Sequence, residues 1–177
     1  MAAPILAATL PPRTIHLRDG GCYRLRVLRP ADAALVLEMF ATLSPETIRA
    51  RYGYLIRHMK PDRAHQLVLT DSVGDISLGL CETLPNGQEK LWAIGRLVHT
   101  PDNCAAECAF LVHDAKRRLG IAARLLLFLR VLARRRGLAR LFAQVQQENR
   151  PMLAVFRKNG AILHFSQFGD VVEVEIP

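Results

Sequence analysis

Several short segments of the chain alternate hydrophobic and polar residues, which is typical of strands with one buried face. The last segment is the clearest, because Val172, Val174 and Ile176 alternate with Glu173 and Glu175. The pattern predicts a second closing strand just before it, and earlier strands over residues 23–29, 75–82, 89–99, 103–112 and 141–146. Pro85-Asn86-Gly87 predicts a hairpin turn between two of these strands.

Other segments repeat their hydrophobic residues every three or four positions, as helices do. The clearest is 120–136, where arginines lie opposite an apolar stripe of Ile121, Leu125, Phe128, Leu129 and Leu132. Further helices are predicted over 31–43, from Ser44 onward, over 62–69 and after Asn149. Ser44 and Asn149 are expected N-caps, each with a proline in the turn that follows, and Gly137 and Gly160 are expected to end helices. This order of elements predicts a mixed α/β sheet with helices on its faces.

The length of 177 residues predicts one domain with a sizeable core, and 50% hydrophobic residues argue against general disorder. The net charge of +8 comes almost entirely from arginine, since the only lysines are Lys60, Lys90, Lys116 and Lys158. Arginine suits bidentate phosphate contacts. The charge fits nucleic acid, an anionic cofactor or an acidic protein surface, and does not choose among them.

The four cysteines, Cys22, Cys81, Cys104 and Cys108, lack a partner pair at zinc-site spacing. We expect free thiols in a reducing cytoplasm and no metal, with Cys104 and Cys108 on the same face of a strand. Residues 1–12 are apolar, but they carry no basic segment and are too short to span a membrane, so we expect a tail or a lightly packed arm. No other segment resembles a targeting or membrane sequence.

A basic, glycine-containing turn joins the strand at 103–112 to the long helix. The first N–H groups of a helix lack partners and lie at the positive end of its dipole, so residues 118–123 could bind a phosphate. Gly120 and Ala122 are small, and Arg117, Arg118 and Arg124 add charge. The alternative is an ordinary helix start with solvated arginines.

Glu107 is the only charged residue between 105 and 112, in an otherwise apolar strand. A carboxylate there is costly unless it is hydrated or paired, and in a cleft its pKa can rise enough for general base chemistry. The alternative is a glutamate that faces solvent or pairs with Arg96. His113, next in sequence to this strand, is expected to be a loop histidine rather than a catalyst.

The turn reads Arg117-Arg118-Leu119-Gly120-Ile121-Ala122 and fits the pattern Gln/Arg-x-x-Gly-x-Gly/Ala. At this point the chain resembles the GNAT superfamily of N-acetyltransferases, over residues 17 to about 165. Three further stretches, 17–32, 43–47 and 148–152, are similar to bacterial protein lysine acetyltransferases. The resemblance implies a mostly antiparallel sheet that splays between its fourth and fifth strands. It also implies an acetyltransferase domain at 17–177 after a tail at 1–16.

The resemblance implies acetyl-CoA as cosubstrate and a primary amine as acceptor, foremost a protein lysine, attacked directly in a ternary complex without a metal. Glu107 matches the catalytic glutamate that serves as general base. In the family, backbone groups at Leu111 and Val112 pair with the pantetheine arm, and Asn149 lies near that arm or the sulfur. The remaining positions match the pyrophosphate turn: Arg117, Arg118, Leu119, Gly120, Ile121, Ala122 and Ala123.

One departure from the family pattern is the stretch Val155-Phe156-Arg157-Lys158, which lacks the tyrosine that often protonates the leaving thiolate. Another group or solvent would then supply the proton. The acceptor side is expected between residues 31 and 69 and at the last two strands. There, Glu46, Asp62 and Asp71 could attract a basic substrate.

Two alternatives remain open at this point, and a third is disfavoured. The same fold could acetylate a polyamine, an amino acid or an antibiotic amine, or it could be a coenzyme A-binding regulatory module with little turnover. A nucleic-acid partner is not indicated, because the arginine-rich stretch at 130–136 lacks interleaved aromatic residues. The sequence gives no indication of the oligomeric state.

Overall fold

Eight strands form one mixed sheet in the computed structural model of the chain, which describes residues 10–68, 74–166 and 169–177. The strand order is β1-β2-β3-β4-β5-β6-β8-β7, and each neighbouring pair is antiparallel except β5 with β6. The strands are β1 (Arg13–His16), β2 (Cys22–Val27), β3 (Ile76–Thr83), β4 (Glu89–His99), β5 (Ala105–Val112), β6 (Arg140–Gln146), β7 (Ile162–Phe165) and β8 (Val171–Ile176).

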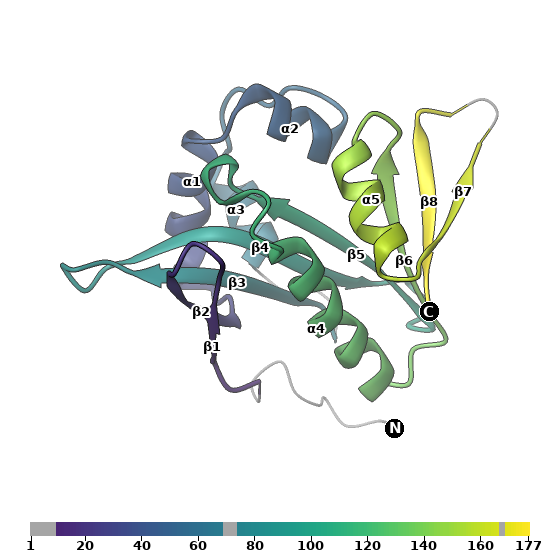
Figure 1. Ribbon diagram of the computed structural model, residues 1–177, viewed down its shortest axis with the longest axis horizontal. Helices are drawn as coiled ribbons and strands as arrows, with labels where there is room; N and C mark the ends of the chain where they lie inside the picture. The colour runs from purple at the N-terminus through teal and green to yellow at the C-terminus, as the bar shows by residue number, and fades with distance from the viewer. Residues whose placement is uncertain (1–9, 69–73, 167–168) are drawn as a thin grey trace.

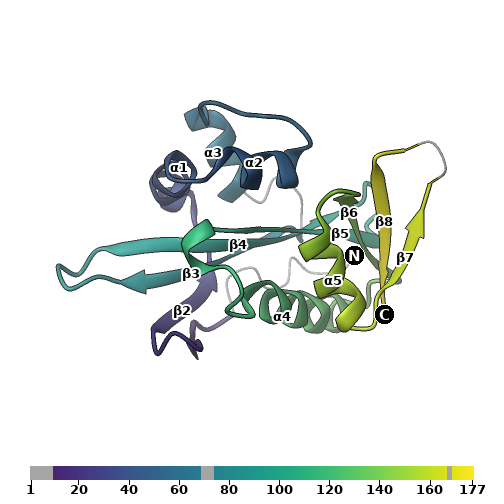
Figure 2. The same cartoon turned by 45° about the horizontal axis from the view of Figure 1, so that its top comes forward.

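Helices cover both faces of the sheet (Figures 1 and 2). One face carries α1 (Ala33–Ala41), α2 (Pro45–Tyr52) and α3 (Pro61–Val68), and the other carries α4 (Ile121–Arg135) and α5 (Arg150–Lys158). Short 3-10 turns, η2 (Pro30–Asp32) and η3 (Asp114–Lys116), precede α1 and the turn that leads into α4. Each helical layer packs on its own hydrophobic core. The predicted α/β architecture with helices on both faces is confirmed.

Local hydrogen bonds explain where the predicted helices begin. Ser44 Oγ accepts the N–H of Thr47 at 3.2 Å, and Pro45 occupies the first turn of α2. Asn149 Oδ1 accepts the N–H of Met152 at 3.2 Å at the start of α5. Both predicted N-caps are confirmed.

The structure corrects three boundaries. Residues 13–16, part of the expected tail, form β1 because Ile15 is buried and its neighbours pair with β2. The predicted helix at 31–43 is a 3-10 turn followed by the shorter α1. Cys104 does not share a strand face with Cys108: Asp102 accepts its N–H in a turn before β5, so Cys104 is exposed while Cys108 is buried. Leu69, the last residue of the predicted third helix, lies outside the described residues.

The sheet splays between β5 and β6. These parallel strands pair over three positions, from Ala105 opposite Arg140 to Glu107 opposite Phe142, and then separate. Because β1 was not predicted, β5 and β6 are the fourth and fifth strands of the sequence-based order, so the expected splay is confirmed. Parallel strands end at the same edge of a sheet, so the turn after β5 and the start of α5 after β6 both lie beside the gap (Figure 2).

We predict that core packing of α4 dominates the stability of the fold. Leu129 is 0% exposed, so Leu129→Ala should lower the free energy of unfolding by about 2–5 kcal/mol. Leu127 on the same helix is 57% exposed, and Leu127→Ala should change it by less than about 0.5 kcal/mol. Urea unfolding of both variants measures the difference, and equal losses would contradict the assigned packing.

Candidate functional site

The backbone of β5 leaves polar groups facing the gap. Hydrogen-bonded and non-hydrogen-bonded pairs alternate along an antiparallel ladder. The N–H of His113 donates to the carbonyl of Trp92 at 2.9 Å, so in the register of β4 with β5 the odd-numbered residues of β5 bond to β4. The backbone groups of Phe110 and Val112 therefore point into the gap, and those of Leu111 point to β4. The backbone groups of Leu111, which were expected to face the pantetheine arm, thus face β4, and those of Val112 face the gap.

The same alternation places the side chain of Glu107 on the face that carries α1–α3, together with Leu111. Glu107 is half-buried, and its carboxylate makes no hydrogen bond or ion pair within the described chain. Burial raises the pKa of Glu107, opposed by the nearby charges of Arg51 and Arg96. No hydrogen bond or ion pair joins Glu107 to Arg96 among the described residues. Arg96 donates to Ser77 Oγ at 3.2 Å and to the carbonyl of Gln66 at 3.3 Å, and it acts on Glu107 through its charge.

The turn at 117–120, before α4, has an unusual backbone. Gly120, the N-cap of α4, has φ 78°, and Arg118 has φ 63°, which is uncommon for a residue with a side chain. No side chain caps this end, and the first helical bond runs from the N–H of Arg124 to the carbonyl of Gly120. The N–H groups of Ile121, Ala122 and Ala123 therefore have no intrahelical partner. A Cβ on Gly120 would meet nothing within 4 Å, so glycine is needed here for its backbone conformation.

The carboxylate of Asp114, at the start of η3, joins this turn to α2. It accepts the N–H of Ser44 at 2.9 Å, Ser44 Oγ at 2.8 Å and Thr47 Oγ1. It also forms an ion pair with Arg117 at 2.9 Å, and Arg117 donates to Thr47 Oγ1. These hydrogen bonds hold the pKa of Asp114 at about 2 despite its partial burial. Sequence reasoning missed Asp114 because its partners on α2 are some 70 residues away.

Asn149 links the other side of the gap to α2. Its Oδ1 caps α5, and its Nδ2 donates to the carbonyl of Ala50 at 3.1 Å. Gly53, which ends α2 with φ 78°, lies against Gln146 of β6: a Cβ there would be 2.9 Å from Gln146 Nε2. The C-terminal end of α2 therefore sits directly beside the gap.

Phe156 and His113 lie near the gap, and their packing and hydrogen bonds are those of structural residues. Phe156, in the stretch without the tyrosine, is 0% exposed and its ring centroid lies 5.9 Å from that of Phe110. His113 Nδ1 accepts the N–H of Ala115 at 3.1 Å, which assigns the proton to Nε2, 3.0 Å from Thr42 Oγ1. Burial lowers the pKa of His113. Both of its nitrogens are engaged, which fits a loop histidine.

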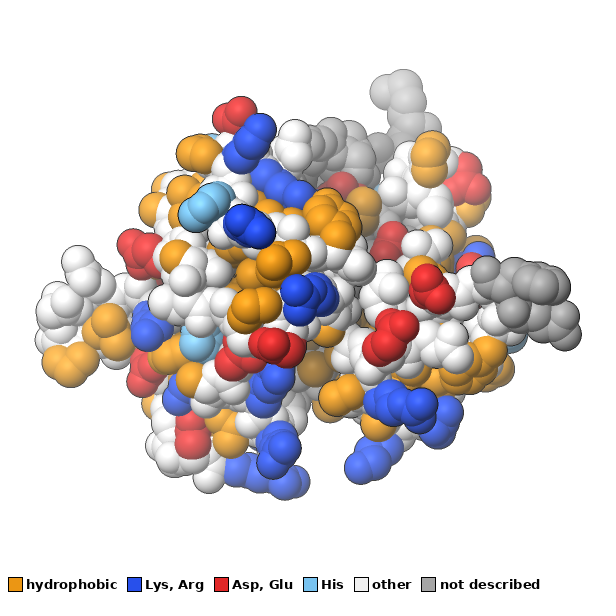
Figure 3. Space-filling view, turned by 90° about the horizontal axis from the view of Figure 1, so that it is seen from above, with side chains coloured by type: hydrophobic (Ala, Val, Ile, Leu, Met, Phe, Trp, Pro, Cys, Tyr) orange, Lys and Arg blue, Asp and Glu red, His pale blue; other side chains and the backbone are white. Residues whose placement is uncertain are grey.

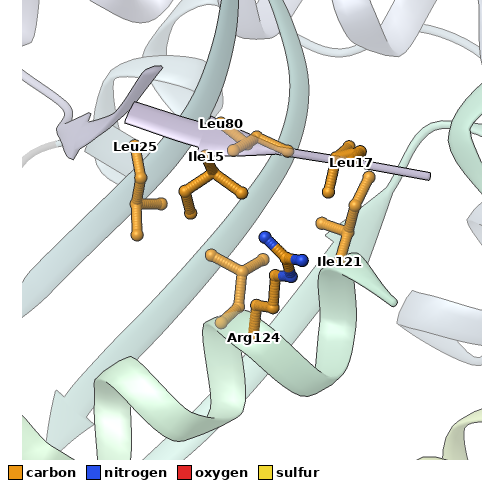
Figure 4. Close-up of a pocket in the computed structure, with 7 residues that line it drawn as sticks. Ile15, Leu17, Leu25, Leu80, Ile121 and Arg124 are labelled. Atoms are coloured by element: carbon orange, nitrogen blue, oxygen red, sulfur yellow. The ribbon is translucent and has the colours of Figure 1, made fainter. Parts of the chain in front are cut away.

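A small enclosed cavity lies next to the start of α4. A cavity of about 10 Å³ lies between the β1–β2 hairpin and the first turn of α4, lined by Leu17, Ile121 and Arg124 among others (Figure 4). Such a volume holds about one water molecule at most. The gap instead opens to solvent: seen from above, basic side chains gather on both sides of an indentation at the lower edge of Figure 3.

Within the described ranges, no three His, Cys, Asp or Glu side chains are grouped as a metal site would require. A search of the same residues finds no helix long and apolar enough to cross a membrane. Burial raises the pKa of Cys81 to about 12 and also raises that of Cys108. Neither thiol is therefore a ready nucleophile near neutral pH.

The model of the acetyltransferase (GNAT) family matches residues 46–161, which is more than half of the chain. The chain belongs to the GNAT family. This GNAT protein is an acetyl-CoA-dependent N-acetyltransferase, and the open edge of β5 together with the uncapped turn fits acetyl-CoA as the cosubstrate of the family.

Solved structures agree with this GNAT assignment. The GNAT domain of S. lividans PAT is 28% identical with a TM-score of 0.82, covering 93% of this chain and 96% of that one. Spermidine N-acetyltransferase from Vibrio cholerae, in complex with CoA and spermine, is 14% identical with a TM-score of 0.65, covering 87% and 94%. The cAMP-binding acyltransferase from Mycobacterium smegmatis is 23% identical with a TM-score of 0.61, covering 97% of this chain and 49% of that one. The last two show the shared fold.

We predict that Asp114 makes stability depend on acid pH. Its pKa is lowered from 3.8 to about 2, so its contribution is complete above about pH 4 and is lost as the pH falls toward 2. Asp114→Asn should therefore cost up to about 2 kcal/mol of unfolding free energy at pH 6 and much less at pH 2. Urea unfolding between pH 2 and 6 measures this difference. Asp62→Asn, at an exposed position on α3, is the control; a pH-independent difference for Asp114→Asn would contradict the assigned ion pair.

Proposed function

We propose that this GNAT protein acetylates lysine side chains of proteins by direct attack of the amine on acetyl-CoA, with Glu107 as the general base. The observation that carries the proposal is a half-buried carboxylate next to an open strand edge, with no hydrogen bond or ion pair to any residue that the structure describes. Glu107 lies at the last position where β5 pairs with β6, immediately before the gap. An amine that reaches the gap from the α1–α3 face would pass this carboxylate.

The donor is expected to bind along the gap. The turn from Arg117 to Ala123 would hold the pyrophosphate through the free N–H groups of Ile121, Ala122 and Ala123, with the charges of Arg117 and Arg118 beside them. The left-handed backbone at Arg118 and Gly120 supports this role, because such turns direct successive N–H groups toward an anion.

The edge of β5 is expected to bind the pantetheine arm as a further strand would be bound. Phe110 and Val112 offer the backbone groups for this, and one of their N–H groups would polarise the thioester carbonyl. When bound, the cosubstrate supplies an acetyl group activated as a thioester. Asn149 would lie beside the arm, although its Oδ1 is engaged as the helix cap and its Nδ2 donates to α2.

Glu107 would remove the proton that a lysine amine carries at neutral pH. A general base works best when its pKa approaches the working pH, and burial moves the pKa of Glu107 in that direction. Direct attack rather than an acyl-enzyme is supported by the two buried thiols, whose raised pKa values disfavour thiolates. With Phe156 enclosed in the core, we assign protonation of the leaving thiolate to solvent.

A protein lysine is favoured as acceptor by the sequence resemblance to bacterial protein lysine acetyltransferases and by the likeness to the GNAT domain of S. lividans PAT. We also propose that 17–177 is the catalytic unit, with β1 as an added edge strand. The buried free thiols Cys81 and Cys108 support the cytoplasmic location expected from the sequence.

We predict that Glu107→Gln lowers kcat at pH 7 by about 100-fold, because the amine then keeps its proton, and leaves the Kd for acetyl-CoA unchanged. Turnover should recover in part at higher pH, where more of the amine is neutral. Steady-state assays on lysine-containing proteins, with calorimetry for Kd, measure both quantities. Glu38→Gln, at an exposed glutamate on α1, is the control. Loss of acetyl-CoA binding with intact turnover would refute the role of Glu107.

We predict the reverse pattern for Gly120→Glu, since it places a carboxylate where the pyrophosphate should bind. The Kd for acetyl-CoA should rise at least about 100-fold, while the protein stays folded. Gly137→Glu is a matched control: both glycines have positive φ, 78° and 68°, and open space at Cβ, so the backbone strain is shared. Calorimetric titration of both variants with acetyl-CoA measures the two Kd values. An equal rise in Kd for the two variants would show that backbone strain, not charge, is responsible.

A further inference from the structure

The surface formed by the end of α2, the following loop and α3 is basic. Between residues 45 and 65 the chain carries five arginines and lysines against two acids, Glu46 and Asp62. We define the α2–α3 surface by the following residues: Arg49, Arg51, Tyr54, Arg57, Lys60 and Arg63. The expectation that Glu46 and Asp62 attract a basic substrate is therefore outweighed by their surroundings, and Asp71 lies outside the described residues.

Basic and apolar side chains are mixed on this surface. Figure 3, which looks down on α2, shows lysine and arginine side chains among hydrophobic ones over the α2–α3 part of the molecule. Arg49, Arg57 and Lys60 are exposed, and Leu55 is 37% exposed between them. Arginine and large apolar residues next to each other are typical of protein-binding surfaces.

An exposed tyrosine of the α2–α3 surface is hydrogen-bonded to an arginine of the same surface. Tyr54 is 55% exposed, and its hydroxyl accepts a hydrogen bond from Arg63 Nη2 at 3.1 Å. The guanidinium of Arg63 lies 5.0 Å from the ring centroid of Tyr52 and 5.9 Å from that of Tyr54. Tyrosine supplies a large contact area at a low cost in conformational entropy, and both tyrosine and arginine are enriched among the residues that dominate interfaces.

The α2–α3 surface begins at the rim of the catalytic gap. The carbonyl of Ala50 bonds to Asn149, Gly53 contacts Gln146, and the charge of Arg51 acts on Glu107. An amine at Glu107 therefore has this surface beside it. The half-buried Glu107 faces the amine, while the residues that flank the amine in its own chain would lie over Arg51, Tyr54 and Arg57.

We propose that the α2–α3 surface binds an acidic protein surface, so that the preferred acceptor is a lysine flanked by Asp and Glu residues. This inference rests on the proposed function and adds the chemistry of the acceptor. Opposite charges raise the association rate and select the orientation of the partner. The charges of the protein are arranged to match such a partner. The carboxylate of Glu107 in the gap would face the cationic lysine, and the cations of the α2–α3 surface outside the gap would face the flanking acids.

The test uses two peptides of equal length with one central lysine, flanked by Glu in one and by Gln in the other. At saturating acetyl-CoA and low salt, kcat/KM should be about tenfold higher for the acidic peptide, and added salt should reduce the difference. Arg57→Glu with Lys60→Glu should abolish the preference and leave the KM for acetyl-CoA unchanged. Arg134→Glu with Arg135→Glu, at exposed positions near the end of α4, makes the same change in net charge and should keep the preference.

Equal kcat/KM for the two peptides, or the same loss in both double variants, would overturn the proposal. If neither peptide is acetylated but spermidine is, the proposed acetylation of protein lysines is contradicted, while the proposal for the α2–α3 surface still has to be tested. Fluorescence anisotropy of a labelled acidic peptide then still tests the surface: binding weakened by Arg57→Glu with Lys60→Glu supports it, and no binding overturns it. Binding of duplex DNA in place of the acidic peptide would assign the surface to nucleic acid and also overturn the proposal.

Discussion

The departure of β6 from β5 after three residue pairs determines the organisation of the site. Strand backbone groups that lose their neighbour need another partner, and at Phe110 and Val112 they face a gap between two elements that diverge toward the same sheet edge. Because both strands run in parallel, each is followed at that edge by the start of a helix. A donor, its phosphate and a base can therefore meet in one place without an enclosed pocket.

The two walls of this gap are fastened to α2 by different chemistry. On the β5 side, the carboxylate of Asp114 binds two hydroxyls, an N–H and Arg117. On the β6 side, Asn149 and Gln146 meet the last turn of α2. Since α2 also begins the basic surface, the elements expected to bind the donor and the acceptor share one rigid support. Substitutions in α2 can therefore affect the binding of the donor as well as that of the acceptor.

The sequence predicted the features whose causes are local. The caps at Ser44 and Asn149, the hairpin at Asn86-Gly87 and the isolated charge of Glu107 all depend on residues a few positions apart. It could not predict that Asp114 binds α2, because that contact requires the tertiary fold. The orientation of Leu111 also depends on the tertiary fold: which residues of β5 face the gap is set by its register with β4, and a shift by one residue reverses the answer. The excess of basic residues between 45 and 65 can be read from the sequence, but its position beside Glu107 cannot.

The amide of Asn149 has a consequence for which sequences this architecture accepts. One end of the side chain must accept a hydrogen bond from the N–H of Met152, and the other must donate one to the carbonyl of Ala50. Aspartate and serine cap helices as well as asparagine does, but an ionised aspartate has no proton to give to Ala50, and a serine hydroxyl is too compact to reach both groups. At most helix starts these residues are interchangeable. Here the second hydrogen bond removes that freedom, so a position that looks like an ordinary cap acts as a spacer that fixes the distance between two helices.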